Sequence, residues 1–331
     1  MEWALHIRTV EEIEHLDLPA VERSSPSSGA TDTVQSATRA VVDELFGPIQ
    51  VTRVYLGNEF CERLIPSVQL LERAHTAAAE RGLALTLLTP YVTDDGIDRL
   101  RPLLSRLEGL AGLAPFAPVA GRGDEAEVVV NDWGVLRFLR REFPTLTPVL
   151  GRLLHKTLRD PLATAYYDGH PQLPPPAHAA LRQSNLTVPA YRTFLDQFGI
   201  RMVEMDDVGF GHAEGQARDV ELEPLPVAAG LHMPYGFVAT GRVCLFASLG
   251  RPKAEKFIAA RECAQECQRH FAEFAANGDP DAAPVPGGPV RMFHRGNTVF
   301  YSRAADRLRT TLTDAESRGV ERVIYQPQLP I

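Results

Sequence analysis

The stretch VTRVYLGNEFCERLIPSVQLLERAHTAAAERGLALTLLTPYV, residues 51–92, decides the fold class of this chain. It opens with an apolar run at 51–57, passes through an amphipathic segment that stops at Gly82, and closes with a second apolar run at 83–92. Such runs are typical of strands buried on both faces, and the segment between them is typical of a helix that connects two parallel strands. The stretch therefore predicts one strand–helix–strand unit of a parallel sheet.

Similar apolar runs recur along the chain. They lie at 126–132, 147–154, 200–206, 228–236 and 321–327, and amphipathic segments separate most of them. Roughly seven such units in about 250 residues fit a closed barrel better than an open sheet. We therefore predict an α/β fold, a (β/α) barrel-like domain with an added C-terminal section. The glycine-rich signatures of dinucleotide-binding and P-loop proteins are absent from the sequence.

Composition shifts divide the chain into three parts. Residues 1–49 are expected to form a strand and a short helix, followed by a Ser/Pro-rich linker over 19–36. Residues 50–274 are expected to form the barrel-like domain, and residues 275–331 a connecting loop and a final closing section. A proline-rich stretch at 166–183 is expected to be an ordered surface loop.

The overall balance of residues limits the function classes. The chain has 331 residues, of which 44% are hydrophobic and 23% are charged, and its net charge is -8. An acidic chain is not expected to bind nucleic acid over a broad surface. No signal peptide and no membrane span are expected, so we expect a cytoplasmic protein, a compartment in which disulfides are rare.

The four cysteines are unevenly distributed. Cys61 follows the apolar run at 51–57, Cys244 follows another apolar run, and Cys263 and Cys267 form a C-x3-C pair. If residues 256–271 form a helix, the thiols of this pair share one helix face. Four thiolates suit zinc or an iron–sulfur cluster. Zinc sites usually use paired C-x2-C knuckles, so a single C-x3-C pair with two isolated cysteines favours the cluster and leaves zinc as the alternative.

Polar residues near the ends of the other predicted strands are candidates for substrate binding. An arginine can hold a carboxylate with two hydrogen bonds, and a histidine can carry a proton. Each of these side chains could instead form a salt bridge or a helix cap, and the Asn-Asp pair before a helix has the pattern of an ordinary N-cap. The candidates are Asn131, Asp132, Arg152, His155, Glu204, His232 and Tyr235.

Five segments in order resemble one known family. They are VYLGNEFCERL (54–64), EVVVNDWGVLRFL (127–139), PVLGRLLHK (148–156), LHMPYGFVATGRVC (231–244) and CAQECQRHF (263–271). Over roughly residues 50–330, the chain resembles the collagenase-like peptidase family and is most similar to its UbiV branch, the oxygen-independent ubiquinone hydroxylation proteins. The order of the cysteines selects this branch over the UbiU branch.

The resemblance implies a barrel-like α/β fold and a 4Fe-4S cluster. It implies that Cys61, Cys244, Cys263 and Cys267 ligate this cluster. It further implies a heterodimer with a UbiU-like partner and the hydroxylation of an aromatic ring without molecular oxygen. In related members that hydroxylate RNA, prephenate is thought to be the oxygen donor. The protease motifs G-x-S-x-G and H-E-x-x-H are absent from this sequence.

We therefore expect an iron–sulfur component of an oxygen-independent hydroxylase. Its substrate would be an aromatic compound, a quinone precursor or a specialised metabolite. Two alternatives stay open at this stage. One is a zinc-stabilised barrel that acts as a hydrolase or binding scaffold, and the other is a non-catalytic partner subunit with a structural cluster.

Overall fold

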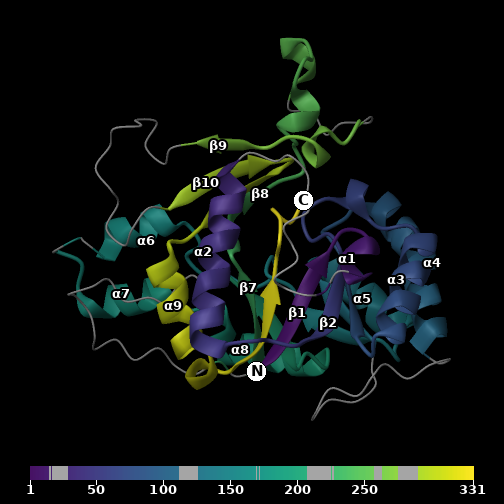
Figure 1. Ribbon diagram of the computed structural model, residues 1–331, viewed down its shortest axis with the longest axis horizontal. Coiled ribbons are helices and arrows are strands. Elements are labelled where there is room, and N and C mark those ends of the chain that lie inside the picture. Colours follow the sequence, from purple (N-terminus) through teal and green to yellow (C-terminus); the bar gives the residue numbers. More distant parts are fainter. Residues whose placement is uncertain are drawn as a thin grey trace.

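Parallel strands close into an eight-stranded barrel in the described part of the chain (Figure 1). The computed structural model describes residues 1–14, 16, 29–111, 126–168, 170, 172–206, 225, 227–256, 263–274 and 290–331. Around the barrel the strands follow the order β1 (Glu2–Ile7), β12 (Val320–Tyr325), β7 (Ala228–Met233), β6 (Met202–Met205), β5 (Thr147–Leu150), β4 (Glu127–Val130), β3 (Ala84–Leu88) and β2 (Val51–Gly57). Every neighbouring pair is parallel, and β1 closes the ring because it pairs with both β2 and β12. The prediction of an α/β fold with a closed barrel of parallel strands is thereby confirmed.

Helices surround the barrel (Figure 1). The longer ones are α2 (Gly29–Phe46), α3 (Val68–Glu80), α4 (Asp94–Ala111), α5 (Trp133–Glu142), α8 (Pro189–Gln197) and α9 (Ala305–Asp314). The shorter ones are α1 (Glu11–Glu14), α6 (Pro161–Asp168) and α7 (Pro175–Arg182), with 3-10 turns at η2 (Glu62–Leu64), η3 (Asn185–Thr187), η4 (Phe246–Ser248), η5 (Lys253–Glu255), η6 (Glu266–Gln268) and η7 (Glu316–Arg318). The largest apolar core lies between strands and helices, and burial of this area drives the fold. No helix in the described part of the chain is long and apolar enough to cross a membrane.

The interior of the barrel is layered because successive side chains of a strand point to opposite faces. An apolar layer is formed by Ala4, Tyr55, Leu88, Val129, Val149, Met202 and Ile324. Toward the amino ends of the strands lies a buried network of two arginines and two glutamates. In it, Arg53 and Arg322 both contact Glu2 and Glu127. Toward the carboxyl ends the inward side chains are again polar, and this polar layer holds the candidate site.

A small antiparallel sheet covers the carboxyl end of the barrel. Its strands follow the order β8 (Tyr235–Thr240), β11 (Thr298–Ser302), β10 (Arg291–Arg295) and β9 (Ala272–Phe274). Figure 1 shows this sheet at the end toward which the arrow of β12 points. Strand β8 starts two residues after β7 ends, so the chain passes directly from the barrel wall into the cover.

The structure differs from the predicted division of the chain near its beginning. Strand β1 is a wall of the barrel, so residues 1–49 are not a section apart from it. Helix α2 starts at Gly29, inside the stretch predicted to be a linker. The reason is a helical spacing of buried residues, which includes Val34, Thr38 and Val42. Residues 19–28 of the predicted linker and residues 275–289 of the predicted connecting loop lie outside the described residues.

Two further local predictions are corrected. The stretch 166–183 contains the end of α6 and all of α7, which begins at a proline because the first helical position needs no backbone N–H donor. The described part of 256–271 is not an α-helix. Gln265 takes a left-handed conformation with φ of 56°, and the segment continues through a 3-10 turn into β9. Cys263 and Cys267 therefore do not share an α-helix face.

The turn after β2 requires glycine. Gly57 has φ of +125°, and a Cβ atom there would lie 2.4 Å from the carbonyl oxygen of Leu88. We expect Gly57→Ala to lower the free energy of unfolding by roughly 3 kcal/mol or more, because it adds backbone strain and a clash with backbone. Urea unfolding measures this change. Gly47→Ala is the matched control, since Gly47 has φ of +63° with nothing within 4 Å, and should cost about 1 kcal/mol. Equal costs at the two positions would show that the contact with Leu88 is unimportant.

Candidate functional site

Three loops at the covered end of the barrel bring the cysteines into one region. Cys61 follows β2, Cys244 follows β8, and the pair Cys263 and Cys267 precedes β9. Burial, with smaller contributions from the charges of the other three cysteines, raises the pKa of the Cys61 thiol to about 11. Cys267 is buried in an apolar cluster that contains Phe60, and Cys244 packs against the same cluster, so these loops lie side by side. All four thiols are free of disulfides.

Side-chain amides tie these loops together. The Asn58 side chain accepts from the backbone N–H groups of Phe60 and Cys61 at 2.9 and 2.8 Å, which fixes the turn after β2. Asn297 Nδ2 donates to the carbonyl oxygens of Phe60 and Gly241, both at 2.7 Å. The Cys61 loop is therefore joined to the segment that leads to Cys244.

The third loop is attached in the same way. Gln265 Nε2 donates to the carbonyl oxygen of Arg63 at 3.2 Å, which links the C-x3-C pair to the Cys61 loop. Cys267 packs under the tight turn at Gly296, where an added Cβ would lie 3.4 Å from the Cys267 Cβ. In the described part of the chain, no three of the cysteine sulfurs lie within 4.8 Å of one another. The sulfurs are thus gathered in one region without converging on a single point.

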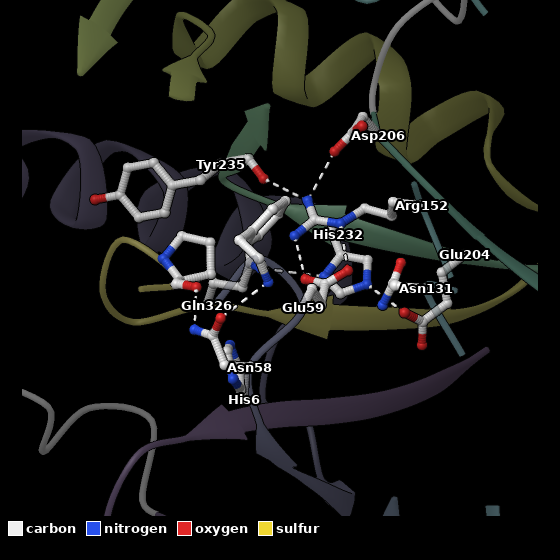
Figure 2. Close-up of polar contacts among 12 residues, drawn as sticks. His6, Asn58, Glu59, Asn131, Arg152, Glu204, Asp206, His232, Tyr235 and Gln326 are labelled. Carbon is white, nitrogen blue, oxygen red and sulfur yellow. Dashed lines mark hydrogen bonds and ion pairs between the residues drawn. The ribbon is translucent and has the colours of Figure 1, made fainter. Parts of the chain in front are cut away.

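Arg152 is the centre of a second, fully buried site inside the mouth of the barrel (Figure 2). Its Nε and Nη2 donate to the two carboxylate oxygens of Glu59. Its Nη1 donates to Asp206 Oδ1 at 2.7 Å and to the carbonyl oxygen of Tyr235 at 3.2 Å. When the Gln326 amide is oriented so that its nitrogen faces the Tyr235 carbonyl, its oxygen accepts from Arg152 Nη2 at 3.2 Å. All five N–H groups of Arg152 are therefore in use.

The charges of this network are balanced. Arg159 donates to the second oxygen of Asp206, so two arginines face two carboxylates. Burial would lower the pKa of Arg152, but the charges of Glu59 and Asp206 raise it overall. A ligand carboxylate would have to displace Glu59 or Asp206 to reach Arg152.

Glu204 and His232 form a contact beside this network. Their side chains are fully buried, and Glu204 Oε2 lies 2.8 Å from His232 Nε2. Burial raises the pKa of Glu204 to about 8. Burial and then the charge of Arg152 lower the pKa of His232 to about 3. Glu59, Glu204 and His232 also offer ligand atoms within 4.8 Å of one another, which is a geometry that a metal ion could use.

The other side chains predicted from the sequence do not donate to or accept from Arg152. Asn131 donates to the Thr89 carbonyl and accepts from the backbone of Leu153, and Asp132 caps α5. The hydroxyl of Tyr235 accepts from Gln35 Nε2 at 3.1 Å. His155 is buried, and neither of its ring nitrogens has a hydrogen-bond partner. The structure thus brings Arg152, Glu204, His232 and the carbonyl of Tyr235 together.

Sequence reasoning missed several members of the network. Glu59, Asp206 and Gln326 each lie within two residues of the end of a barrel strand. Their position at or near the end of an apolar run was the available signal, because parallel barrels carry their functional groups at the carboxyl ends of strands. No protein-family model matches this sequence, and no curated protein matches it at a significant level. Function is therefore inferred from the geometry and from the residues.

Replacing Arg152 tests the network. We expect Arg152→Met to lower the free energy of unfolding by about 3–5 kcal/mol, because it leaves two buried carboxylates without their cation. Arg101→Met is the control, since Arg101 pairs with Glu142 at a half-exposed position and should cost less than about 1 kcal/mol. Unfolding in guanidinium chloride measures the free energy of unfolding of both variants. Adding Glu59→Gln to Arg152→Met should recover part of the loss, and no recovery would contradict the charge argument.

Proposed function

We propose that this chain is an iron–sulfur component of an oxygen-independent hydroxylation system. The observation that carries the proposal is that Cys61, Cys244, Cys263 and Cys267 all lie on loops at the covered end of a parallel barrel, and that these loops contact one another. A 4Fe-4S cluster is held by four cysteine thiolates, which is the donor set present here. The substrate would be an aromatic or quinone-precursor compound, and the partner a UbiU-like protein.

The sulfurs are not close enough together to bind one zinc ion as they stand. Zinc with four thiolates would hold the sulfurs about 3.8 Å apart, given its bond length and tetrahedral geometry. No three sulfurs of the described chain are within 4.8 Å of one another. A cluster is wider than an ion and holds its ligands farther apart. To bind one zinc ion, the sulfurs would therefore have to move closer together.

Hydrogen bonds to sulfur support the same assignment. The backbone N–H of Ala247 points to Cys244 Sγ and that of Gln265 to Cys263 Sγ, both at 3.4 Å. Gln268 Nε2 points to Cys267 Sγ at 3.6 Å. N–H donors around sulfur favour the thiolate form and tune the potential of iron–sulfur clusters.

Two arginines supply positive charge beside Cys267. Arg295 donates to the carbonyl oxygen of Cys267 at 2.6 Å, and Arg8 donates to the side chain of Gln268. Burial lowers the pKa of both arginines, and the charge of Cys267 raises it in each case. In the described part of the chain, Arg295 donates to carbonyl oxygens of Cys267, Gln268 and Leu329 and forms no ion pair with a carboxylate. Its charge is therefore available to offset an anionic thiolate centre.

The chemistry divides between the cluster and the barrel. When bound, a cluster with four protein thiolates supplies electron transfer, because it has no open iron position. The aromatic side chains of Phe60, Phe237, Phe246, Phe293 and Phe300 pack with Cys267 and exclude water from this region. The loop after β2 joins the two sites, since Glu59 contacts Arg152 while Cys61 lies two residues farther along the chain. Electrons would thus be delivered at the mouth of the barrel, where the polar layer can hold a ligand.

Metal analysis of protein purified without air tests the proposal. We expect a brown protein with about four iron and four sulfide per chain, because four thiolates hold one such cluster. Cys61→Ala and Cys267→Ala should each lose most of the iron. Glu204→Gln removes no sulfur and should retain it. A colourless protein with one equivalent of zinc would overturn the assignment, and copurification of a paralogous chain tests the partner separately.

A further inference from the structure

The surface around the four cysteines carries an excess of positive charge. On the described cysteine loops (58–67, 240–256 and 263–271), the exposed and partly exposed charged side chains are six cations and three anions. The cations are Arg63, Arg242, Arg251, Lys253, Lys256 and Arg269, and the anions are Glu62, Glu255 and Glu266. These loops therefore have a surplus of positive charge, whereas the whole chain has a net charge of -8. We call this region the basic surface.

Four of its cations lack a counterion. In the part of the chain that the structure describes, no carboxylate forms an ion pair with Arg242, Lys253, Lys256 or Arg269. Arg242 Nη2 donates instead to the carbonyl oxygen of Val92 at 2.9 Å. The positive charge of these four side chains is therefore not neutralised within the described chain and is available to a partner.

Two apolar side chains are exposed among these cations. Leu249 is 58% exposed and Val243 is 41% exposed, although large apolar side chains are usually buried. Val243 directly precedes Cys244, and Leu249 directly follows η4. In Figure 1 the green chain that follows β8 stands out beyond the small sheet. The basic surface thus combines unpaired charge with apolar area that a partner could bury.

The basic surface lies next to the thiols. Arg242 stands two residues before Cys244, and Arg269 stands two residues after Cys267. The 3-10 turns η4 and η6, which follow Cys244 and contain Cys267, pack against each other. Three of the cysteines are partly exposed, and only Cys267 is buried. A molecule bound to this surface would therefore be close to the sulfur centre.

We propose that the basic surface docks a small acidic electron-transfer protein, which supplies electrons to the centre held by the four thiols. One electron passes from the reduced donor to the oxidised centre, so the donor is oxidised and this chain is reduced. No covalent bond forms or breaks in this step. The electron transfer rests on the proposed function, whereas the docking rests on the charge and exposure of these loops.

The character of the basic surface favours a protein over a nucleic acid. Electron-transfer complexes have small interfaces, in which a polar rim surrounds a more apolar centre. Sites for single-stranded nucleic acid use exposed aromatic side chains on which the bases stack. The exposed apolar side chains here, Val243 and Leu249, are aliphatic. The net charge of -8 would also oppose the approach of a long polyanion.

Charge reversal tests the docking. The probe is a reduced 2Fe-2S ferredoxin of strongly negative net charge, mixed without air with the oxidised full chain. Lys253→Glu combined with Lys256→Glu should slow the electron transfer about tenfold at about 0.1 M salt, because complementary charge accelerates association. The difference should vanish near about 1 M salt, which screens such charges. Stopped-flow absorbance measures both rates.

A second pair of cations on α5 supplies the matched control. Arg137→Glu combined with Arg140→Glu makes the same change of charge at the same spacing, on an exposed helix face outside the cysteine loops. It should slow the transfer by less than about twofold, because salt screens distant charges. Reduced methyl viologen, a small cation, should reduce the lysine variant at least as fast as wild type. Equal ferredoxin rates for the lysine variant and the control would overturn the docking.

Equilibrium binding of the same ferredoxin tests the surface without the centre. Leu249→Ser should weaken binding about tenfold, as expected for the loss of one buried leucine side chain. Val188→Ser removes an apolar side chain that is 48% exposed beside α8 and should leave the affinity unchanged. Equal affinities for these two variants would overturn the apolar part of the surface. Ferredoxin binding by a chain without iron would contradict only the proposed function.

Two further results would assign the basic surface to another partner. Single-stranded RNA that binds more tightly than ferredoxin, and is lost in the Lys253→Glu and Lys256→Glu variant, would identify a nucleic-acid site. A copurifying paralogous chain that is lost in the same variant would identify the interface of that chain. Either result would overturn the docking of an acidic electron-transfer protein.

Discussion

The guanidinium of Arg152 is the interaction on which the mouth of the barrel depends. Its five N–H groups reach the loop after β2, the end of β6, the start of β8 and the residue after β12. One side chain thus fixes four segments that are distant in sequence. Because Glu59 and Cys61 lie on the same loop, the contact between Arg152 and Glu59 also helps to orient the loop that carries Cys61.

Charge balance explains why such a polar interior is tolerated. Taking an ion out of water costs several kcal/mol, and only well-placed partners recover this cost. At the mouth, Arg152 and Arg159 face two carboxylates, and at the opposite end Arg53 and Arg322 face two glutamates. The apolar layer around Tyr55 and Ile324 separates these two networks. Each end is therefore neutral on its own.

The strands of the barrel could be predicted from the sequence better than the closure of the barrel or the contacts inside it. Continuous apolar runs and crossover helices are local patterns, so the strands from β2 to β7 could be predicted. The place of β1 could not, because it depends on pairing with β12 at a separation of 320 residues. Arg152, Glu204 and His232 were singled out by their positions near strand ends. Glu59, Asp206 and Gln326 were not, because their importance comes from partners on other strands. The C-x3-C segment was predicted to be helical, and the left-handed conformation of Gln265, which ends such a helix, could not be read from the sequence.

The pairing of β1 with β12 has a consequence for biosynthesis. Translation produces β1 near the beginning of the described chain and β12 near its end, so the ring stays open while the strands between them emerge from the ribosome. During this interval the free edges of β1 and β7 expose unpaired backbone groups, which are open to association with other nascent chains. Slow elongation would lengthen this exposure, and a chaperone that covers the two edges would matter most for this step.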